Sequence, residues 1–331
     1  MKQSFFQITT VGFAQTTYDN GFLHKKGKTM TTNWITRRDL LQVGGAAMAG
    51  VTLAGRAKSS PPTRKKVLFL TKSAGYEHGV VRRVDGALAY AEHALIELGN
   101  KHGFDVEASK DASIFDGNLE SYAAFAFFTT GDLTTTAGDG QPAMSPAGKQ
   151  AFLNAIRAGK GFVGFHCASD TFHTPGKSSE NQVRKDPYIA MLGGEFMNHG
   201  RQQKARMKVI DPAFPGIESL GGSFLLHEEW YSLKNFAQDM HVLLVLETEG
   251  MDGTGYQRPP FPATWARREG RGRVFYTSMG HREDVWTNPA FQSIAVGGIQ
   301  WALGNIDADV SPNFNDVTPQ ASVLLSPKPA P

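Results

Sequence analysis

The sequence predicts an α/β fold: an open, mainly parallel β-sheet flanked by helices, with a mixed C-terminal part. Two observations support this class. Between residues 66 and 165, short apolar runs of strand length alternate with stretches of helical periodicity, which is typical of successive strand–helix–strand units. In the second half the signals are mixed, and a short glycine-bearing turn at 269–272 joins two apolar runs, which predicts a hairpin.

The segment before residue 65 is expected to lie outside this fold. Met30 offers a second start of translation, so we interpret residues 1–29 as a non-native extension. Residues 30–57 contain the pair Arg37–Arg38, a weakly apolar stretch and small residues, the pattern of a bacterial Tat export signal. Residues 58–64 are then a linker. The alternative is that the whole segment is a disordered basic tail.

An export signal predicts a periplasmic or otherwise exported protein. The apolar stretch of the signal is too short to remain as a membrane span. Cys167 is the only cysteine, so no intramolecular disulfide can form. The formal net charge is +3 without a basic stripe that interleaves with aromatics, so no nucleic-acid partner is expected. Residues 65–305 suit one large domain, and 306–331 are expected to be an extended Pro/Ser-rich tail.

The first half of the domain predicts two helices and four strands. The helix at 145–158 has clear ends, with Ser145 as N-cap, Pro146 at the first position and Gly159 as C-cap. A helix at 85–99 is expected to end in a glycine stop signal. Strands separated by helices favour parallel pairing with right-handed connections. The four strands are expected at 66–70, 104–108, 122–129 and 162–165.

The second half predicts five strands and a closing helix. The turn at 269–272 joins the last two strands. Residues 288–303 are expected to form an amphipathic helix. The strands are expected at 204–210, 224–226, 240–247, 263–267 and 273–278.

Two of the predicted strands end at a histidine. His166 follows the strand at 162–165 and begins a polar group that includes Asp170, and His281 comes soon after the strand at 273–278. Ligands of open α/β sheets bind at the carboxyl ends of the strands. The functional site is therefore expected at this edge of the sheet.

Several separated stretches, in the same order, resemble the ThuA-like family, the trehalose-utilisation proteins. The likeness extends from Lys66 to Gly304. It implies a fold similar to that of class I glutamine amidotransferases, which is flavodoxin-like. It also implies a role in bacterial sugar utilisation, with a small-molecule carbohydrate as ligand, particularly a 3-keto-glycoside made by a partner oxidoreductase. The stretches are 159–170, 191–199, 228–231 and 262–281.

The amidotransferase reaction is not expected of this chain. It requires a cysteine on the turn after the strand and a histidine–carboxylate pair that activates it. When the strand at 162–165 is set against this pattern, His166 takes the nucleophile position and Cys167 comes one residue late. His281 and Glu283 match the spacing of the histidine–carboxylate pair, but the position of the nucleophile governs the reaction.

Acid–base chemistry is the favoured mechanism. Histidine titrates near neutrality, and a carboxylate can orient it or accept a proton. In a 3-keto sugar the proton at carbon 2 is acidified by the ketone, so its removal drives elimination of the glycosidic group, and water addition completes a hydrolysis. Glu229 is chosen over Glu228 because, together with Tyr231, it matches the family pattern. The candidate catalytic residues are His166, His281, Asp170 and Glu229, and the candidate substrate-binding residues are His78, His199 and Tyr231.

Two alternatives remain open. Histidines and carboxylates from several loops could hold a divalent metal that polarises a ketone or activates water, although no His-x-x-x-His or His-Glu-x-x-His spacing is present. The chain could also be a non-catalytic sugar-binding or interaction domain on an amidotransferase-like scaffold. The number of titratable groups at matching positions favours an enzyme that cleaves or rearranges oxidised glycosides.

Overall fold

A nine-stranded sheet forms the centre of the computed structural model, which describes residues 63–324. Its order is β2-β1-β3-β4-β11-β10-β9-β6-β7. The first five strands in this order are parallel, and the order 2-1-3-4 is that of flavodoxin-like folds. These strands are β1 (Lys66–Leu70), β2 (Asp105–Ser109), β3 (Ala124–Phe127), β4 (Gly161–Phe165) and β11 (Gly272–Thr277).

The rest of the sheet is antiparallel, which confirms the predicted mixed C-terminal part. The expected hairpin joins β10 to β11 through a loop of only Gly270 and Arg271. From β10 onward each neighbouring pair runs in opposite directions. These strands are β6 (Gln203–Val209), β7 (Ser223–Glu228), β9 (His241–Glu247) and β10 (Phe261–Glu269).

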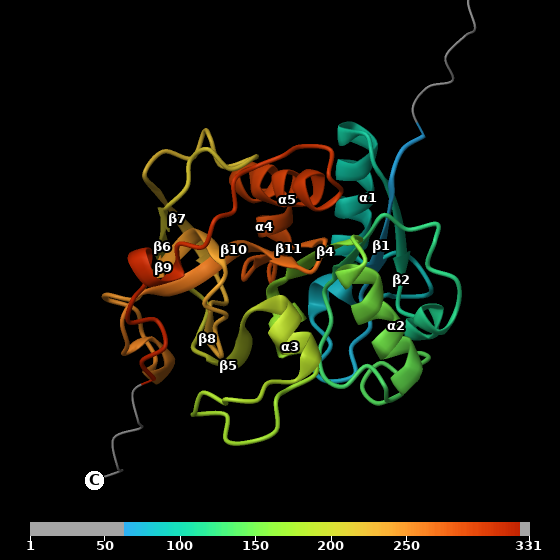
Figure 1. Ribbon diagram of the computed structural model, residues 1–331, viewed down its shortest axis with the longest axis horizontal. Helices are drawn as coiled ribbons and strands as arrows, with labels where there is room; N and C mark the ends of the chain where they lie inside the picture. Colours follow the sequence, from blue (N-terminus) through green and yellow to red (C-terminus); the bar gives the residue numbers. More distant parts are fainter. Residues whose placement is uncertain (1–62, 325–331) are drawn as a thin grey trace, which may run out of the picture. The chain divides into compact units, whose positions relative to one another are not determined.

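Helices cover both faces of the sheet. Helices α1 (Tyr90–His102) and α5 (Pro289–Ala302) lie on one face, and α2 (Pro146–Arg157) and α3 (Pro187–Leu192) lie on the other (Figure 1). The inner parallel strands β3 and β4 are apolar and every one of their residues is buried, as in parallel strands covered on both faces, whereas the edge strand β2 is half-buried. None of the described helices is long and apolar enough to cross a membrane.

Helix α2 begins as its sequence predicts. The Ser145 side chain accepts a hydrogen bond from the Gly148 amide, and Pro146 follows at the first helical position. This cap satisfies one of the amides that the first turn of a helix leaves without a partner. The C-cap is Ala158, one residue before the predicted Gly159, which follows with a positive φ of 121°.

Helix α1 differs from the prediction at both ends. It starts later than expected, because Asp85 and Gly86 have positive φ angles of 51° and 76° and cannot continue a right-handed helix. It also continues through Gly99, which was predicted to end it. A Cβ at Gly99 would lie 2.8 Å from the carbonyl oxygen of Phe104, so this glycine permits close packing of the helix against the chain. The helix ends instead at Gly103, with a φ of 82°.

Two short strands that the sequence did not predict form a separate antiparallel pair. They are β5 (Glu195–His199) and β8 (Tyr231–Lys234), and His199 lies opposite Tyr231. Segment β5 shows neither the alternation nor the long apolar run that signals a strand, and β8 alternates over only four residues. This pair places two candidate site residues next to each other.

The segment after residue 305 is not an extended tail over its described length. It contains the short helix α6 (Phe314–Val317), and the ring of Phe314 packs on that of Phe236. Further along, Arg258 donates a hydrogen bond to the carbonyl of Ala321. The proposed extension, export signal and all but the last two residues of the linker lie outside the described residues.

Candidate functional site

His166 occupies a sharp turn at the carboxyl end of β4. It has a positive φ of 41° and begins a 3₁₀ turn, His166–Asp170. Its imidazole is fully buried, and its Nδ1 lies 2.9 Å from the carbonyl oxygen of Ser278. A carbonyl oxygen can only accept, so Nδ1 carries the proton and Nε2 of the neutral ring has a free lone pair.

His281 and Glu229 meet His166 from two other segments. His281 follows β11, the parallel neighbour of β4, and its Nδ1 lies 3.3 Å from His166 Nε2. Glu229 lies between β7 and β8, and its Oε2 is 3.1 Å from His281 Nδ1 and 3.6 Å from His166 Nε2. The carboxyl ends of two adjacent strands therefore hold two imidazoles against one carboxylate.

His78, in the loop after β1, completes a cluster with these residues. Its ring centre lies 5.1 Å from that of His166 and 5.2 Å from that of His281. Its Nε2 is 3.3 Å from Tyr231 Oη, and its Nδ1 is buried without a hydrogen-bond partner among the described residues. We call His78, His166, Glu229 and His281 the histidine cluster; each offers one ligand atom, and these atoms lie within 4.8 Å of one another.

Burial and mutual contact determine the charges in the cluster. Burial lowers the pKa of His166, and it lowers the pKa of His78 to about 2, so both rings are neutral near pH 7. Burial also acts to raise the pKa of Glu229, but the adjacent imidazoles of His166 and His281, the second of which donates a hydrogen bond, outweigh burial and hold that pKa well below the ordinary value. Glu229 is therefore an ionised carboxylate beside neutral imidazoles.

Glu228 has a different task from its neighbour Glu229. Its side chain is fully buried, and its Oε2 accepts hydrogen bonds from the amides of Gly280, at 2.8 Å, and His281, at 3.1 Å. Burial raises its pKa to about 8. Nothing in the sequence indicated that both carboxylates would be enclosed. Glu228 fixes the backbone that carries His281.

Asp170 does not join the histidine cluster, although we predicted it as a catalytic residue. Its Oδ1 lies 2.6 Å from Nε2 of His173, and Nδ1 of the same ring lies 3.1 Å from Glu195 Oε1. The 3₁₀ turn after His166 directs the Asp170 side chain to this pair. Hydrogen bonds that the His173 ring donates, first to Asp170 and second to Glu195, raise the pKa of His173 to about 9. Nothing in the sequence singled out His173.

His199 and Tyr231 lie at the border of the histidine cluster. His199 Nδ1 is 3.5 Å from Glu229 Oε1, and 43% of its side chain is exposed. The Tyr231 ring is buried, with its centre 4.1 Å from that of His166. Gln202, which the sequence did not indicate, has its side-chain nitrogen 2.9 Å from His281 Nε2. Six of the seven candidate residues therefore lie together, with Asp170 apart.

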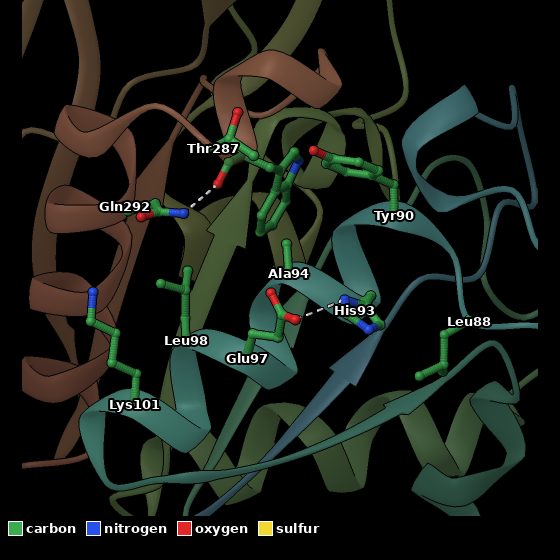
Figure 2. A pocket seen from close by; sticks show the side chains of 10 residues that line it. Leu88, Tyr90, His93, Ala94, Glu97, Leu98, Lys101, Thr287 and Gln292 are labelled. Carbon is green, nitrogen blue, oxygen red and sulfur yellow. Dashed lines mark hydrogen bonds and ion pairs between the residues drawn. The ribbon is translucent and has the colours of Figure 1, made fainter.

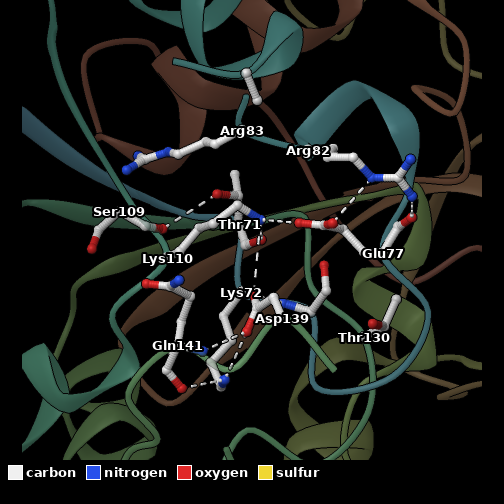
Figure 3. Close-up of polar contacts among 12 residues, drawn as sticks. Thr71, Lys72, Glu77, Arg82, Arg83, Ser109, Lys110, Thr130, Asp139 and Gln141 are labelled. Atoms are coloured by element: carbon white, nitrogen blue, oxygen red, sulfur yellow. Dashed lines mark hydrogen bonds and ion pairs between the residues drawn. The ribbon is translucent and has the colours of Figure 1, made fainter. Parts of the chain in front are cut away.

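A buried ionic network holds the loop that carries His78 (Figure 3). Lys110, which is 5% exposed, donates hydrogen bonds to the Glu77 carboxylate and to the Thr71 carbonyl, both at 3.0 Å. Lys72, fully buried, pairs with Asp139 at 3.1 Å. Buried charges are retained only where they are paired. The pair Lys110–Glu77 therefore fixes the residue directly before His78.

A cavity of about 620 Å³ opens beside His281, with Gln202 and Arg282 in its wall, and this is within the usual size of a small-molecule site. Another cavity, of about 570 Å³, lies between α1 and the segment that begins α5 (Figure 2). No residue of the histidine cluster lines this one, and its His93 and Glu97 side chains pair with each other at 3.5 Å. The first cavity is the one that gives access to the cluster.

Cys167 is unsuited to act as a nucleophile. It is 1% exposed, and burial raises the pKa of its thiol well above the ordinary value. The thiolate is the reactive form of cysteine. The turn after β4 thus carries the imidazole of His166 where the amidotransferase reaction would need a cysteine.

Comparison with known proteins identifies the family. The family model for ThuA, described as trehalose utilisation, matches residues 66–302. The chain belongs to the ThuA family. The resemblance inferred from the sequence is thereby confirmed. No curated protein matches this ThuA-family chain.

Solved structures confirm the fold class. A putative ThuA-like protein from Parabacteroides merdae is 18% identical, with a TM-score of 0.52, over 74% of this chain and 92% of that one. Another, from Bacteroides uniformis, is 19% identical, with a TM-score of 0.51, over 74% of this chain and 94% of that one. Both likenesses concern the fold alone.

Proposed function

We propose that this ThuA-family protein cleaves the glycosidic bond of 3-keto-glycosides by acid–base chemistry. The observation that carries the proposal is the histidine cluster itself, in which neutral imidazoles and an ionised carboxylate meet at the carboxyl ends of adjacent parallel strands beside a cavity. Ligands of this fold class bind at that edge. Membership of a family described as trehalose utilisation favours a sugar as the ligand.

The proposed reaction needs a base and a group that stabilises negative charge on oxygen. The base removes the proton from carbon 2, and the electron pair of that bond becomes delocalised over the neighbouring ketone as an enolate. The pair then forms the double bond between carbons 1 and 2 as the bond from carbon 1 to the glycosidic oxygen breaks, and that oxygen leaves as an alcohol after it takes up a proton. Addition of water to the double bond completes a net hydrolysis.

The exposure of each imidazole indicates which of these roles it can have. His166 is fully buried, whereas 17% of the His281 side chain and 43% of the His199 side chain are exposed. Proton transfer to and from a sugar requires contact with it. We therefore assign proton transfer to His281 and His199, and stabilisation of the enolate oxygen to the buried side of the cluster. Asp170 has no part in this assignment because His173 engages it.

The test is to incubate the purified protein with a 3-keto-glycoside that has a chromogenic aglycone, and separately with the unoxidised parent glycoside. Release is expected from the keto compound alone. His281→Ala should lower its rate by about a hundredfold or more, the usual value of a positioned acid or base. The matched control is His93→Ala, which removes an exposed histidine paired only with Glu97, and it should leave the rate unchanged.

Two results would contradict the proposal. Equal release from the parent glycoside would show that the ketone has no part in the reaction. Sugar binding without any release from the keto compound would favour the alternative function, a non-catalytic sugar-binding domain.

The export signal at 30–57 adds a location to this proposal. We propose that the protein is delivered folded to the periplasm by the twin-arginine route, which accepts folded cargo and agrees with a domain that has no disulfide to form. The partner that the reaction requires is an oxidoreductase that converts the hydroxyl at carbon 3 of a glycoside to a ketone.

A further inference from the structure

We infer that the histidine cluster binds one divalent transition-metal cation of the Zn²⁺ class. The proposed ligands are His78, His166 and His281 through one ring nitrogen each, and Glu229 through a carboxylate oxygen. This inference deepens the proposed function, and its meaning for catalysis rests on that function. Binding of the cation is independent of any sugar and can be measured by itself.

The spacing of the side chains is that of a tetrahedral site. With Zn–N and Zn–O distances of about 2.0–2.1 Å, ligand atoms at tetrahedral angles lie about 3.3 Å apart, and imidazole ring centres about 5 Å apart. The three ring centres here are separated by 5.1, 5.2 and 5.1 Å, and the ring planes are inclined by 75° to 89°. His166 Nε2, His281 Nδ1 and Glu229 Oε2 are separated by 3.1 to 3.6 Å.

The hydrogen bonds leave two of the nitrogens available to a cation. His166 donates from Nδ1 to the Ser278 carbonyl, so Nε2 presents a lone pair to the cluster. Such a bond from the second nitrogen to a backbone carbonyl is usual for metal-binding histidines. In His78, Nδ1 is buried without a hydrogen-bond partner among the described residues, while Nε2 lies beside Tyr231. A cation bound at Nδ1 would satisfy that atom, and few other groups could.

The proton of His281 must move from Nδ1 to Nε2 before Nδ1 can bind the cation. Gln202 donates to its Nε2, since the amide oxygen of Gln202 accepts from Arg282 at 2.6 Å, so in the metal-free chain Nδ1 of His281 carries the proton and donates it to Glu229. Coordination by Nδ1 moves the proton to Nε2 and requires the exposed amide of Gln202 to turn its oxygen toward the ring.

The types of donor atom select the class of cation. The cluster offers imidazole nitrogens and one carboxylate in a largely buried place. Imidazole-rich sites suit Zn²⁺ and its neighbours, whereas Mg²⁺ and Ca²⁺ prefer sites made of oxygen atoms. The only thiol of the chain, Cys167, is not a member of the cluster.

A cation in this place would change how the proposed reaction is divided among the residues. If its coordination expanded from four to five, it would also bind the ketone oxygen and act there as a Lewis acid. His281 would then bind the cation through Nδ1 and could no longer transfer a proton through that atom. His199 would transfer the proton on the solvent-exposed side of the cluster. The Nδ1 of His199 lies 2.9 Å from the Gly200 carbonyl, so the lone pair of the neutral ring is on Nε2.

The test uses the purified full chain, stripped with a chelator and free of sugar. Zn²⁺ is titrated by calorimetry, and Co²⁺ by its visible absorption, whose intensity distinguishes four-coordinate from six-coordinate ions. One equivalent should bind, with a four-coordinate Co²⁺ spectrum. Glu229→Gln and His281→Ala should each weaken Zn²⁺ binding by more than the ~10–100-fold typical of an outer-shell change. His93→Ala is the control for loss of a histidine elsewhere and should bind as the wild type does.

Absence of binding by the wild type, a six-coordinate Co²⁺ spectrum, or unchanged affinity in both ligand variants would overturn the inference. Thermal unfolding shows whether each variant is folded. If neither variant folds, the wild-type Co²⁺ spectrum alone tests the inference. Binding without cleavage of the keto compound would refute the proposed function alone. Cleavage at full rate in the stripped protein would refute the catalytic role of the cation and leave the proposed function standing.

Discussion

His166 shows how one residue can change the chemistry that a turn supports. Its left-handed backbone costs roughly 1–2 kcal/mol in a residue other than glycine, and such strain persists only where the surroundings enforce it. Here Tyr276 donates a hydrogen bond to the His166 carbonyl at 2.7 Å, and the Ser278 carbonyl accepts from the ring. An amidotransferase needs a thiolate at this point, whereas this protein holds a neutral imidazole there.

His173 is expected to make stability depend on pH. Contacts with Asp170 first, and with Glu195 second, raise its pKa from 6.5 to about 9 in the folded state. The stabilisation is therefore complete below about pH 6.5 and is lost as the pH rises through about 9. The difference in free energy of unfolding between the wild type and His173→Gln, measured with denaturant, should be largest near pH 6 and shrink towards pH 9.5.

The matched control is His93→Gln, because His93 is 64% exposed and pairs only with an exposed glutamate. Its effect on stability should be close to zero across the same range. A difference for His173→Gln that grew with pH would mean that the ring is neutral in the folded protein.

The sequence could predict those candidate residues that come directly after the end of a strand. His166 and His281 come after buried strands, and parallel neighbours bring such residues together. Asp170 was predicted as a catalytic residue, but its side chain lies against His173, because the direction of a side chain four residues into a tight turn is not encoded in spacing. The contacts of Gln202 with His281 and of His173 with Glu195 join segments distant in the chain and have no local signal.

At the scale of elements, the parallel half of the sheet could be predicted closely and the site's border could not. Strand β1 has its predicted bounds and β4 starts one residue before them, since long apolar runs between polar turns are a strong signal. Strands β5 and β8 are short and pair over a long separation. Their pairing nevertheless places His199 and Tyr231 beside the histidine cluster.

The position of the loop after β1, which carries His78, is predicted to depend on Lys110. Lys110→Met removes the ion pair with Glu77 and the hydrogen bond to the Thr71 carbonyl, and should lower the free energy of unfolding by about 2 kcal/mol. Because Glu77 precedes His78, Zn²⁺ affinity should also fall by about tenfold or more. Denaturant unfolding and calorimetric titration measure the two effects.

Lys66→Met provides the comparison, since Lys66 and its partner Glu107 are each about 40% exposed, and exposed pairs contribute less than about 1 kcal/mol. Zn²⁺ affinity should be unaffected in this variant. Loss of stability in Lys110→Met with full Zn²⁺ affinity would show that the ionic network does not position His78.

At the scale of the whole molecule, export is predicted to depend on the arginine pair of the signal. Replacement of Arg37 and Arg38 by lysine should leave the protein in the cytoplasm of a bacterial host, because the twin-arginine route recognises the pair itself. Cell fractionation followed by immunoblotting measures this. Arg56→Lys, which changes another arginine of the same segment, should be exported normally, and export of the double variant would refute the assignment.

The four proposed ligands come from widely separated parts of the chain, from the loop after β1 to the residues that follow β11. A chain that has not yet joined these parts has no site, so the affinity for the cation belongs to the native topology alone. The ratio of tightly bound metal to protein in a preparation would then count the molecules that have finished folding. A colorimetric chelator could serve as a direct assay of refolding yield.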